Sequence, residues 1–183
     1  EYEQFSNTNG LPGYVSQLAT GLQQMQAGDL DSYPYGSLLS WKNIWHGWGN
    51  LQAYALLLAS EKLGNSEFRN TAIKEIDGFY SYLIKENYYA EIHFSMSETG
   101  ITALQIKKFP QIAYIIRPMV YACLKAYEAT GNNEYLEKAA EHAAWLFGKN
   151  PVNKIMYNPH TGRCFDGIES AIKINMNSGA EST

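Results

Sequence analysis

The feature that most constrains the fold of this chain is an internal repeat. The segment GNSEF at 64–68 recurs 67 positions later as GNNEY at 131–135, and the same shift pairs Tyr54 with Tyr121. It also matches small residues, namely Ala55 with Ala122, Ala59 with Ala126 and Ala72 with Ala139. Each copy reads as a long helix with an apolar 3.6-residue period, a Gly-Asn turn and a return helix. The repeat therefore predicts two copies of one αα-hairpin.

Repeated αα-hairpins build either open solenoids or closed α/α toroids. The helices expected here, with about 20 residues or more, are longer than those of a ~34-residue tetratricopeptide unit. Non-helical segments of about 20 residues separate the hairpins, and a regular solenoid has no need of such segments. We therefore predict a mainly all-α single domain over 1–183 that forms part of an α/α toroid, with the open solenoid as the alternative.

The apolar period places the individual elements. Helices are expected over 13–27, 37–63 and 67–86, and again after Pro110. The first has a stripe of apolar residues expected to be buried, namely Tyr14, Val15, Leu18, Leu22 and Met25. The third is expected to begin with Ser66 as its N-cap. Between 88 and 109 polar and apolar residues alternate around a Glu-Thr-Gly turn, which predicts a small β-hairpin.

Composition and charge exclude several classes of function. The hydrophobic fraction of 45% is ordinary for a globular protein, and a net charge of -4 leaves no basic footprint for nucleic acid. No apolar run approaches the ~18 residues of a membrane span, so no membrane partner is expected. The two cysteines, Cys123 and Cys164, and the four histidines show no metal-binding spacing, so we expect neither metal nor cofactor.

The compartment and the extent of the protein are weaker inferences. Two unpaired thiols fit a reducing compartment, so a cytoplasmic protein is expected. The chain opens with Glu1 rather than Met and closes on Thr183 without a stop signal in its pattern. We expect it to be the C-terminal part of a larger protein.

The last 39 residues, 145–183, lose the helical period and carry turn signals a few residues apart. Long loops of this kind in compact domains are usually functional. Asp166 and Glu181 are each bracketed by small residues, which would leave a carboxylate reachable from a cleft. The alternatives are an Asp-Gly turn for Asp166 and a first-turn helix carboxylate for Glu181. Asn175 and Asn177 alternate and are expected to point the same way, toward a ligand or toward loop carbonyls.

Aromatic residues offer a second candidate site. Trp41, Trp45 and Trp48 recur at helical spacing with His46 between two of them. Aromatic faces stack on the apolar faces of pyranose rings, so the set predicts a sugar platform, although the same stripe would also suit a helical core. Glu91 and His93 in the predicted hairpin, 88–109, share one side of their strand; an exposed strand face without a ligand is the alternative there.

Three blocks of the sequence resemble the six-hairpin α/α-toroid glycosidase superfamily, with a family-9-like C-terminal portion. They are WHGWGNLQAYALLLASEKLGN at 45–65, the stretch 111–151, and the motifs YNPHTGRCFDGI and INMNSGAEST within 157–183. Since the family's ring takes six hairpins and about five helices are expected here, the resemblance implies part of a ring. It also implies a carbohydrate ligand in a cleft at the end of the ring that carries 88–109 and the terminal loop.

The residues and the resemblance together give three functional hypotheses. The first is a glycoside-hydrolase-like protein, in which Asp166 or Glu181 supplies acid or base catalysis. The expected substrate-binding residues are Trp41, Trp45, His46, Trp48, His93, Tyr157, Arg163, Asn175 and Asn177. The second is a sugar isomerase or epimerase, in which His46 and His93 move protons. The third is a non-catalytic helical-repeat interaction module. The sequence gives no indication of oligomeric state.

Overall fold

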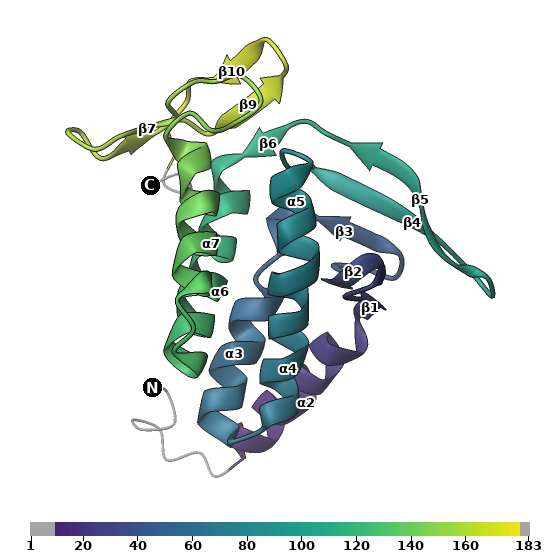
Figure 1. Cartoon of the computed structure of the whole chain (residues 1–183). Helices are drawn as coiled ribbons and strands as arrows, with labels where there is room; N and C mark the ends of the chain where they lie inside the picture. Colours follow the sequence, from purple (N-terminus) through teal and green to yellow (C-terminus); the bar gives the residue numbers. More distant parts are fainter. Residues whose placement is uncertain (1–9, 180–183) are drawn as a thin grey trace.

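The computed structural model describes residues 10–179, in which helices stand side by side and small sheets gather at one end (Figure 1). The helices are α2 (Leu11–Gln24), α3 (Gln52–Leu63), α4 (Ser66–Lys74), α5 (Ser81–Lys85), α6 (Ala113–Thr130) and α7 (Glu134–Ala143). A π-helical turn, Glu75–Tyr80, joins α4 to α5, and 3-10 turns cover Gly47–Gly49 and Ala144–Leu146.

The two predicted αα-hairpins are present, and their turns match in detail. Helix α3 ends at Gly64 with φ 66°, and α6 ends at Gly131 with φ 73°. A positive φ strains any residue with a Cβ, which is why glycine occupies both positions. The Asn that follows each glycine then bonds to the start of the return helix: Asn65 Oδ1 and Asn132 Oδ1 each accept the backbone N–H two positions on, at 3.0 and 3.1 Å. Asn65 is the N-cap of α4, whereas the N-cap of α7 is Asn133, one residue after Asn132. The cap of α4 is therefore Asn65, not the expected Ser66.

Matched positions of the repeat also bring the hairpins together. Helix α3 packs on α4 and on α6, and α6 packs on α7. The rings of Tyr54 and Tyr121 lie 5.8 Å apart between α3 and α6. The paired alanines Ala59 and Ala126 are both buried, since a small side chain lets neighbouring helices approach closely. The residues that match in the repeat are thus also residues through which the two hairpins pack against each other.

Ten strands occur within residues 10–179, so the mainly all-α prediction is only partly correct. One of two three-stranded antiparallel sheets within this range consists of β3 (Ile44–His46), β4 (Glu91–Ser97) and β5 (Gly100–Lys107), in the order β3-β4-β5. Pairing of β4 with β5 confirms the predicted hairpin. Strands β1 (Gln26–Asp29) and β2 (Ser32–Leu38) pair with each other. The C-terminal lobe holds β6 (Gln111–Ile112), β7 (Tyr157–Asn158), β8 (Arg163–Cys164), β9 (Gly167–Ser170) and β10 (Lys173–Asn175).

The expected single helix over 37–63 is wrong in its first half. That half completes β2, turns, forms β3 and a 3-10 turn, and only then enters α3. The backbone hydrogen bonds of β3 go to β4, about 47 residues further along the chain, and no local pattern reveals such a partner. A Cβ on Gly47 would come within 2.5 Å of the Ile115 side chain, so the turn is fitted against α6.

The first helix covers Leu11–Gln24 rather than 13–27, and its expected buried stripe is partly wrong. Val15 and Leu22 pack against the core, whereas Tyr14 and Leu18 remain 67% and 72% exposed. Helix α2 meets neighbours mainly along α3, so only one side of its apolar surface is covered within the described residues.

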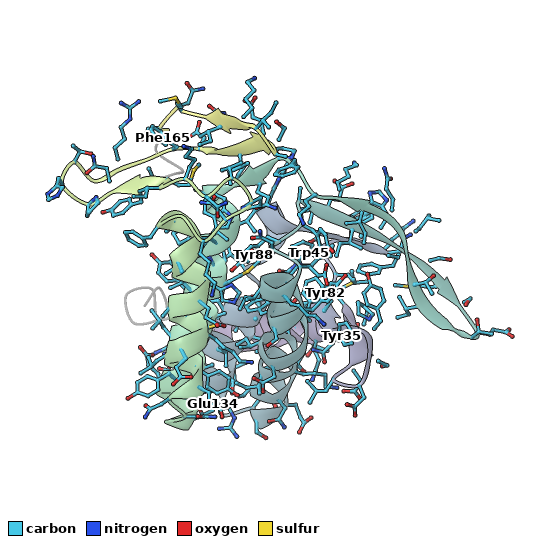
Figure 2. The ribbon with its side chains drawn as sticks, turned by 45° about the horizontal axis from the view of Figure 1, so that its top comes forward. Tyr35, Trp45, Tyr82, Tyr88, Glu134 and Phe165 are labelled. Atoms are coloured by element: carbon cyan, nitrogen blue, oxygen red, sulfur yellow. The ribbon has the colours of Figure 1, made fainter. Side chains whose placement is uncertain are left out.

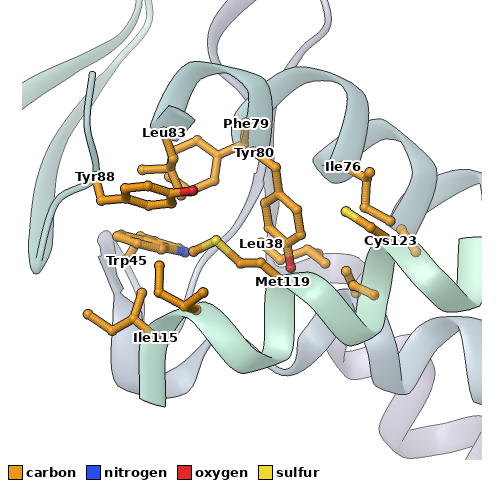
Figure 3. Packing of buried hydrophobic residues seen from close by; sticks show 14 of the residues in the cluster. Leu38, Trp45, Ile76, Phe79, Tyr80, Leu83, Tyr88, Ile115, Met119 and Cys123 are labelled. Atoms are coloured by element: carbon orange, nitrogen blue, oxygen red, sulfur yellow. The ribbon is translucent and has the colours of Figure 1, made fainter. Parts of the chain in front are cut away.

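Aromatic and aliphatic side chains from helices and strands form one core (Figure 3). The fully buried Trp45 ring lies 5.0 Å from the Phe79 ring, edge to face, and Met119 on α6 packs in the same layer. Figure 2 shows Trp45 and Tyr82 inside, between the sheet and the helices. Among residues 10–179 no helix has the length and hydropathy that crossing a membrane requires.

Candidate functional site

Two rows of opposed residues, five of them polar and one apolar, cross the β3-β4-β5 sheet. His46 lies opposite Glu91, and Glu91 lies opposite Lys107. Ile44, His93 and Gln105 make the second row in the same way. Directly opposed residues of antiparallel strands project from the same face, as do residues two apart on one strand. Both rows therefore share the outer face, which we call the polar face, while the alternating residues Trp45 and Ile92 are buried on the other side.

Glu91 occupies the centre of the polar face. Its Oε1 accepts a hydrogen bond from Lys107 Nζ at 2.7 Å and is also in contact with His93 Nε2. The hydrogen bonds from Lys107 and then from His93 hold the pKa of Glu91 below its ordinary value, so the carboxylate is ionised. The side chains of Glu91 and His93 are 25% and 27% exposed, so a ligand on this face could reach both.

Two exposed tryptophans border the polar face. Trp41 bridges to Ile44 and is 64% exposed, and Trp48 is 60% exposed with its ring 5.9 Å from the His46 ring. The His46 backbone N–H donates to Ser40 Oγ at 3.2 Å, which fixes the turn between them. His46 Nδ1 is buried and has no hydrogen-bond partner within residues 10–179.

The predicted three-tryptophan platform is therefore wrong as a set. Trp45 alternates onto the buried side of β3 and packs on Phe79, so it cannot stack on a ligand. Trp41 and Trp48 remain available, but they flank a strand and its turns rather than forming a helical stripe. The spacing of four and three residues between these tryptophans predicts one helical face, but the segment is a strand between turns.

Asp166, in the C-terminal lobe, lies beside the first residue of α6. Its backbone oxygen accepts the Ala113 N–H, and its backbone N–H donates to the Asn177 oxygen, both at 2.8 Å. The side-chain Oδ1 accepts the Gly179 N–H at 3.0 Å. This partner is 13 residues away, so the carboxylate serves more than its own Asp-Gly turn. Glu181, the other predicted catalytic carboxylate, lies outside the described residues.

The remaining predicted residues belong to the C-terminal lobe. Tyr157 and Arg163 line an open groove of about 560 Å³ together with Phe165, which Figure 2 shows among the strands of this lobe. The Arg163 guanidinium lies 6.0 Å from the Phe165 ring. Asn175 Oδ1 accepts the Asn177 N–H at 3.1 Å, so the Asn175 side chain is engaged in a local turn.

The first turn of α6 links the two groups of residues. Asp166 bonds to Ala113, as described, and Asn50, just after the Trp48 turn, donates from Nδ2 to the Ile115 oxygen at 3.0 Å. Asp166 and Asn50, two residues after Trp48, therefore both bond to the first turn of α6.

Sequence reasoning missed Lys107 and Gln105. Both lie on β5, and their place on the polar face depends on an irregularity in the β4-β5 pairing between His93 and Phe94. The pairing that starts at Ser97 opposite Gly100 would, if continued regularly, put Ile106 opposite Glu91. The shift of one residue brings Lys107 there instead.

Comparison with known proteins confirms the fold. No family model matches the sequence, and no curated protein matches it either. Similar solved structures include a cellobiose 2-epimerase from Bacillus thermoamylovorans B4167, with a TM-score of 0.62 and 11% identity over 95% of this chain and 44% of that one.

Two further solved structures are similar to this chain in fold. A sugar epimerase from a ruminal bacterium gives a TM-score of 0.60 with 15% identity over 94% of this chain and 45% of that one. An unsaturated glucuronyl hydrolase specific for heparin gives 0.57 with 12% identity over 90% and 44%. All three have the α/α-toroid fold, and this chain spans less than half of their length. The fold implied by the sequence resemblance is therefore the observed one.

Proposed function

We propose that this chain is part of a carbohydrate-active protein, glycoside-hydrolase-like, which binds an oligo- or polysaccharide at the strand-bearing end of the helical ring. The observation that carries the proposal is the polar face, where exposed Trp41 and Trp48 border His46, Glu91 and His93. Aromatic faces stack on pyranose rings, while imidazole and carboxylate groups hydrogen-bond to sugar hydroxyls. The fold is shared with enzymes that act on sugars, according to their names.

Hydrolysis of a glycosidic bond needs one carboxyl group that donates a proton and one carboxylate that activates water or attacks. The ionised Glu91 is unsuited to proton donation but suited to base or charge-stabilising work. Asp166, beside the start of α6, is our candidate for the second carboxyl group, and Glu181 is the alternative. Tyr157 and Arg163 would extend the binding surface along the groove of the C-terminal lobe.

A second candidate function is sugar epimerisation or isomerisation. The specific observation in its favour is that two histidines, His46 on β3 and His93 on β4, lie on the same face of the sheet. Glu91, on β4 opposite His46, shares this face. Imidazole groups change protonation near neutral pH and serve as acid and base in proton transfer. Two of the structures similar in fold are named as sugar epimerases.

Isothermal calorimetry against a panel of neutral and uronate-containing oligosaccharides tests sugar binding. Loss of one stacking ring should weaken affinity by about 1 kcal/mol, near fivefold, in Trp48→Ala. Tyr14→Ala is the matched control, because Tyr14 is equally exposed but lies on α2. Binding of no sugar by the folded wild-type chain would contradict the proposal. Binding of a protein partner in its place would select an interaction module.

Two further variants separate the enzymatic alternatives. If a bound sugar is cleaved, Asp166→Asn should abolish cleavage while His93→Gln retains part of it. If a sugar is epimerised, His93→Gln should abolish turnover while Asp166→Asn leaves it largely intact. The products, analysed by chromatography, distinguish a shorter sugar from an isomer of the same mass.

A further inference from the structure

We infer that His93 is a proton-transfer residue whose Nδ1 exchanges a proton with the bound ligand, and that Glu91 and Lys107 act as its positioning residues. The inference rests on the proposed function, because it takes the ligand to be a sugar bound on the polar face. It adds a role for Lys107, and it assigns to Glu91 the charge-stabilising role of a residue that positions His93.

The hydrogen-bond chemistry determines the tautomer of His93. An ionised carboxylate can only accept hydrogen bonds, and Glu91 Oε1 is in contact with His93 Nε2. Nε2 must therefore carry the proton, which leaves the lone pair of the neutral ring on Nδ1. Nδ1 has no hydrogen-bond partner within residues 10–179 and is not among the buried polar atoms. A nitrogen with a free lone pair thus faces away from Glu91 and is open to a ligand.

Lys107 fixes the carboxylate in turn. An ammonium group has three donors and no acceptor, and Nζ donates to the same Oε1 at 2.7 Å. Oε1 is thereby held between an ammonium on β5 and an imidazole on β4. The result is an oriented chain from ammonium to carboxylate to imidazole, the arrangement by which a carboxylate orients and stabilises a catalytic histidine.

The surroundings distinguish this cluster from an ordinary surface ion pair. A surface pair between Glu91 and Lys107 alone would contribute about 0–1 kcal/mol and would need no third member. Here the third member is a histidine that lies opposite Ile44, and Ile44 is bridged to the exposed Trp41. The proton-exchanging residue therefore lies on the strand that neighbours β3, directly opposite the residue to which the exposed Trp41 is bridged.

The step itself needs no further reactant. Nδ1 accepts a proton from the bound sugar as the N–H bond forms and the O–H or C–H bond breaks, and the bonding electron pair stays on the sugar. The ring becomes an imidazolium, whose charge the Glu91 carboxylate offsets. Return of the proton from Nδ1 to sugar or water restores the neutral ring, and no electron is gained or lost.

The first test is nitrogen-15 NMR of the histidine rings in the wild-type chain, with His93→Gln identifying the signals. We expect the His93 Nε2 proton to give a downfield signal that exchanges slowly with water, as a proton donated to a carboxylate does. Glu91→Ala should abolish this signal and Lys107→Met should weaken it. Lys108→Met is the matched control, because Lys108 bonds to the Glu86 backbone oxygen instead.

A merely structural ion pair between Glu91 and Lys107 would give a different result. Absence of the Nε2 signal in the wild type, or its persistence in a folded Glu91→Ala variant, would overturn the inference that Glu91 positions His93. Circular dichroism of each variant shows whether it is folded.

The second test uses whichever sugar the binding screen identifies and measures its turnover. Glu91→Ala should lower kcat by at least about tenfold, which is part of the 10²- to 10⁴-fold that general acid-base catalysis supplies, with KM changed much less. An unchanged kcat would overturn the catalytic role. Absence of sugar binding in the wild type would overturn the proposed function and the role of Nδ1 toward sugar, whereas the NMR result reports on the hydrogen-bonded chain independently.

Discussion

Glu75 carries a sharp prediction, because it is a carboxyl group buried in the core. It begins the π-helical turn, is 1% exposed, and accepts the Leu38 N–H on Oε1 at 2.7 Å. Its Oε2 is buried without a hydrogen-bond partner within residues 10–179. Burial raises the pKa of Glu75 to about 8, against a smaller lowering from the Leu38 hydrogen bond. The folded chain therefore holds a neutral Glu75 at neutral pH.

The sign and size of the effect follow by linkage. The unfolded chain releases the Glu75 proton near the ordinary pKa of 4.5, whereas the folded chain keeps it up to about pH 8. The stabilisation from this group is complete below pH 4.5 and is lost as the pH rises toward 8. At 1.36 kcal/mol per pKa unit, the loss is roughly 3 kcal/mol at pH 7 and roughly 5 kcal/mol above pH 8.

Glu75→Gln should remove this pH dependence. The amide oxygen can still accept the Leu38 N–H, and an amide nitrogen replaces the protonated oxygen in the same volume. We expect the variant to match the wild type at pH 4.5 to within about 1 kcal/mol and to exceed it by up to about 5 kcal/mol at pH 9. The nearby Tyr80 stays neutral throughout, because burial raises its pKa well above the ordinary value.

Urea unfolding followed by tryptophan fluorescence at several pH values measures the difference. Glu98→Gln is the control, because Glu98 lies exposed in the turn of the β4-β5 hairpin and its replacement should change little at any pH. An advantage of Glu75→Gln that is the same at pH 5 and pH 9 would refute the assignment of a neutral, buried carboxyl group.

Three further predictions concern packing and access. Gly78→Ala should destabilise the chain by several kcal/mol in urea unfolding, because its Cβ would come within 2.2 Å of a β2 carbonyl oxygen, whereas Gly21→Ala on α2 meets open space and should stabilise by up to about 1 kcal/mol. The buried Asn150 donates to two backbone oxygens and accepts from two backbone N–H groups, so Asn150→Ala should cost roughly 2–4 kcal/mol, measured as a lower urea midpoint with an unchanged slope. Cys123 and Cys164 are both buried, and burial raises the pKa of Cys123 to about 12, so Ellman's reagent should label neither thiol until urea unfolds the chain; rapid labelling of the native state would contradict their burial.

Local sequence was sufficient to predict the two repeated αα-hairpins. Gly64 and Gly131 end helices because glycine tolerates a positive φ, and the side chain of the Asn that follows each accepts a backbone N–H at the start of the next helix. The β4-β5 hairpin was predictable for the same reason, since alternation and a turn are local signals. The shared side of Glu91 and His93 followed from their spacing of two along one strand.

Only the tertiary structure decided which of the candidate side chains meet. Trp41, Trp45 and Trp48 look equivalent in sequence, but pairing of β3 with a strand far along the chain buries Trp45 and leaves the other two exposed. Lys107 reaches Glu91 through a one-residue shift of register that no local pattern specifies. Propensity and capping act over a few neighbouring residues, whereas strand register and burial depend on contacts between distant segments. The sequence therefore determined the repeated hairpins, and the packing of the strands against them decided the composition of the polar face.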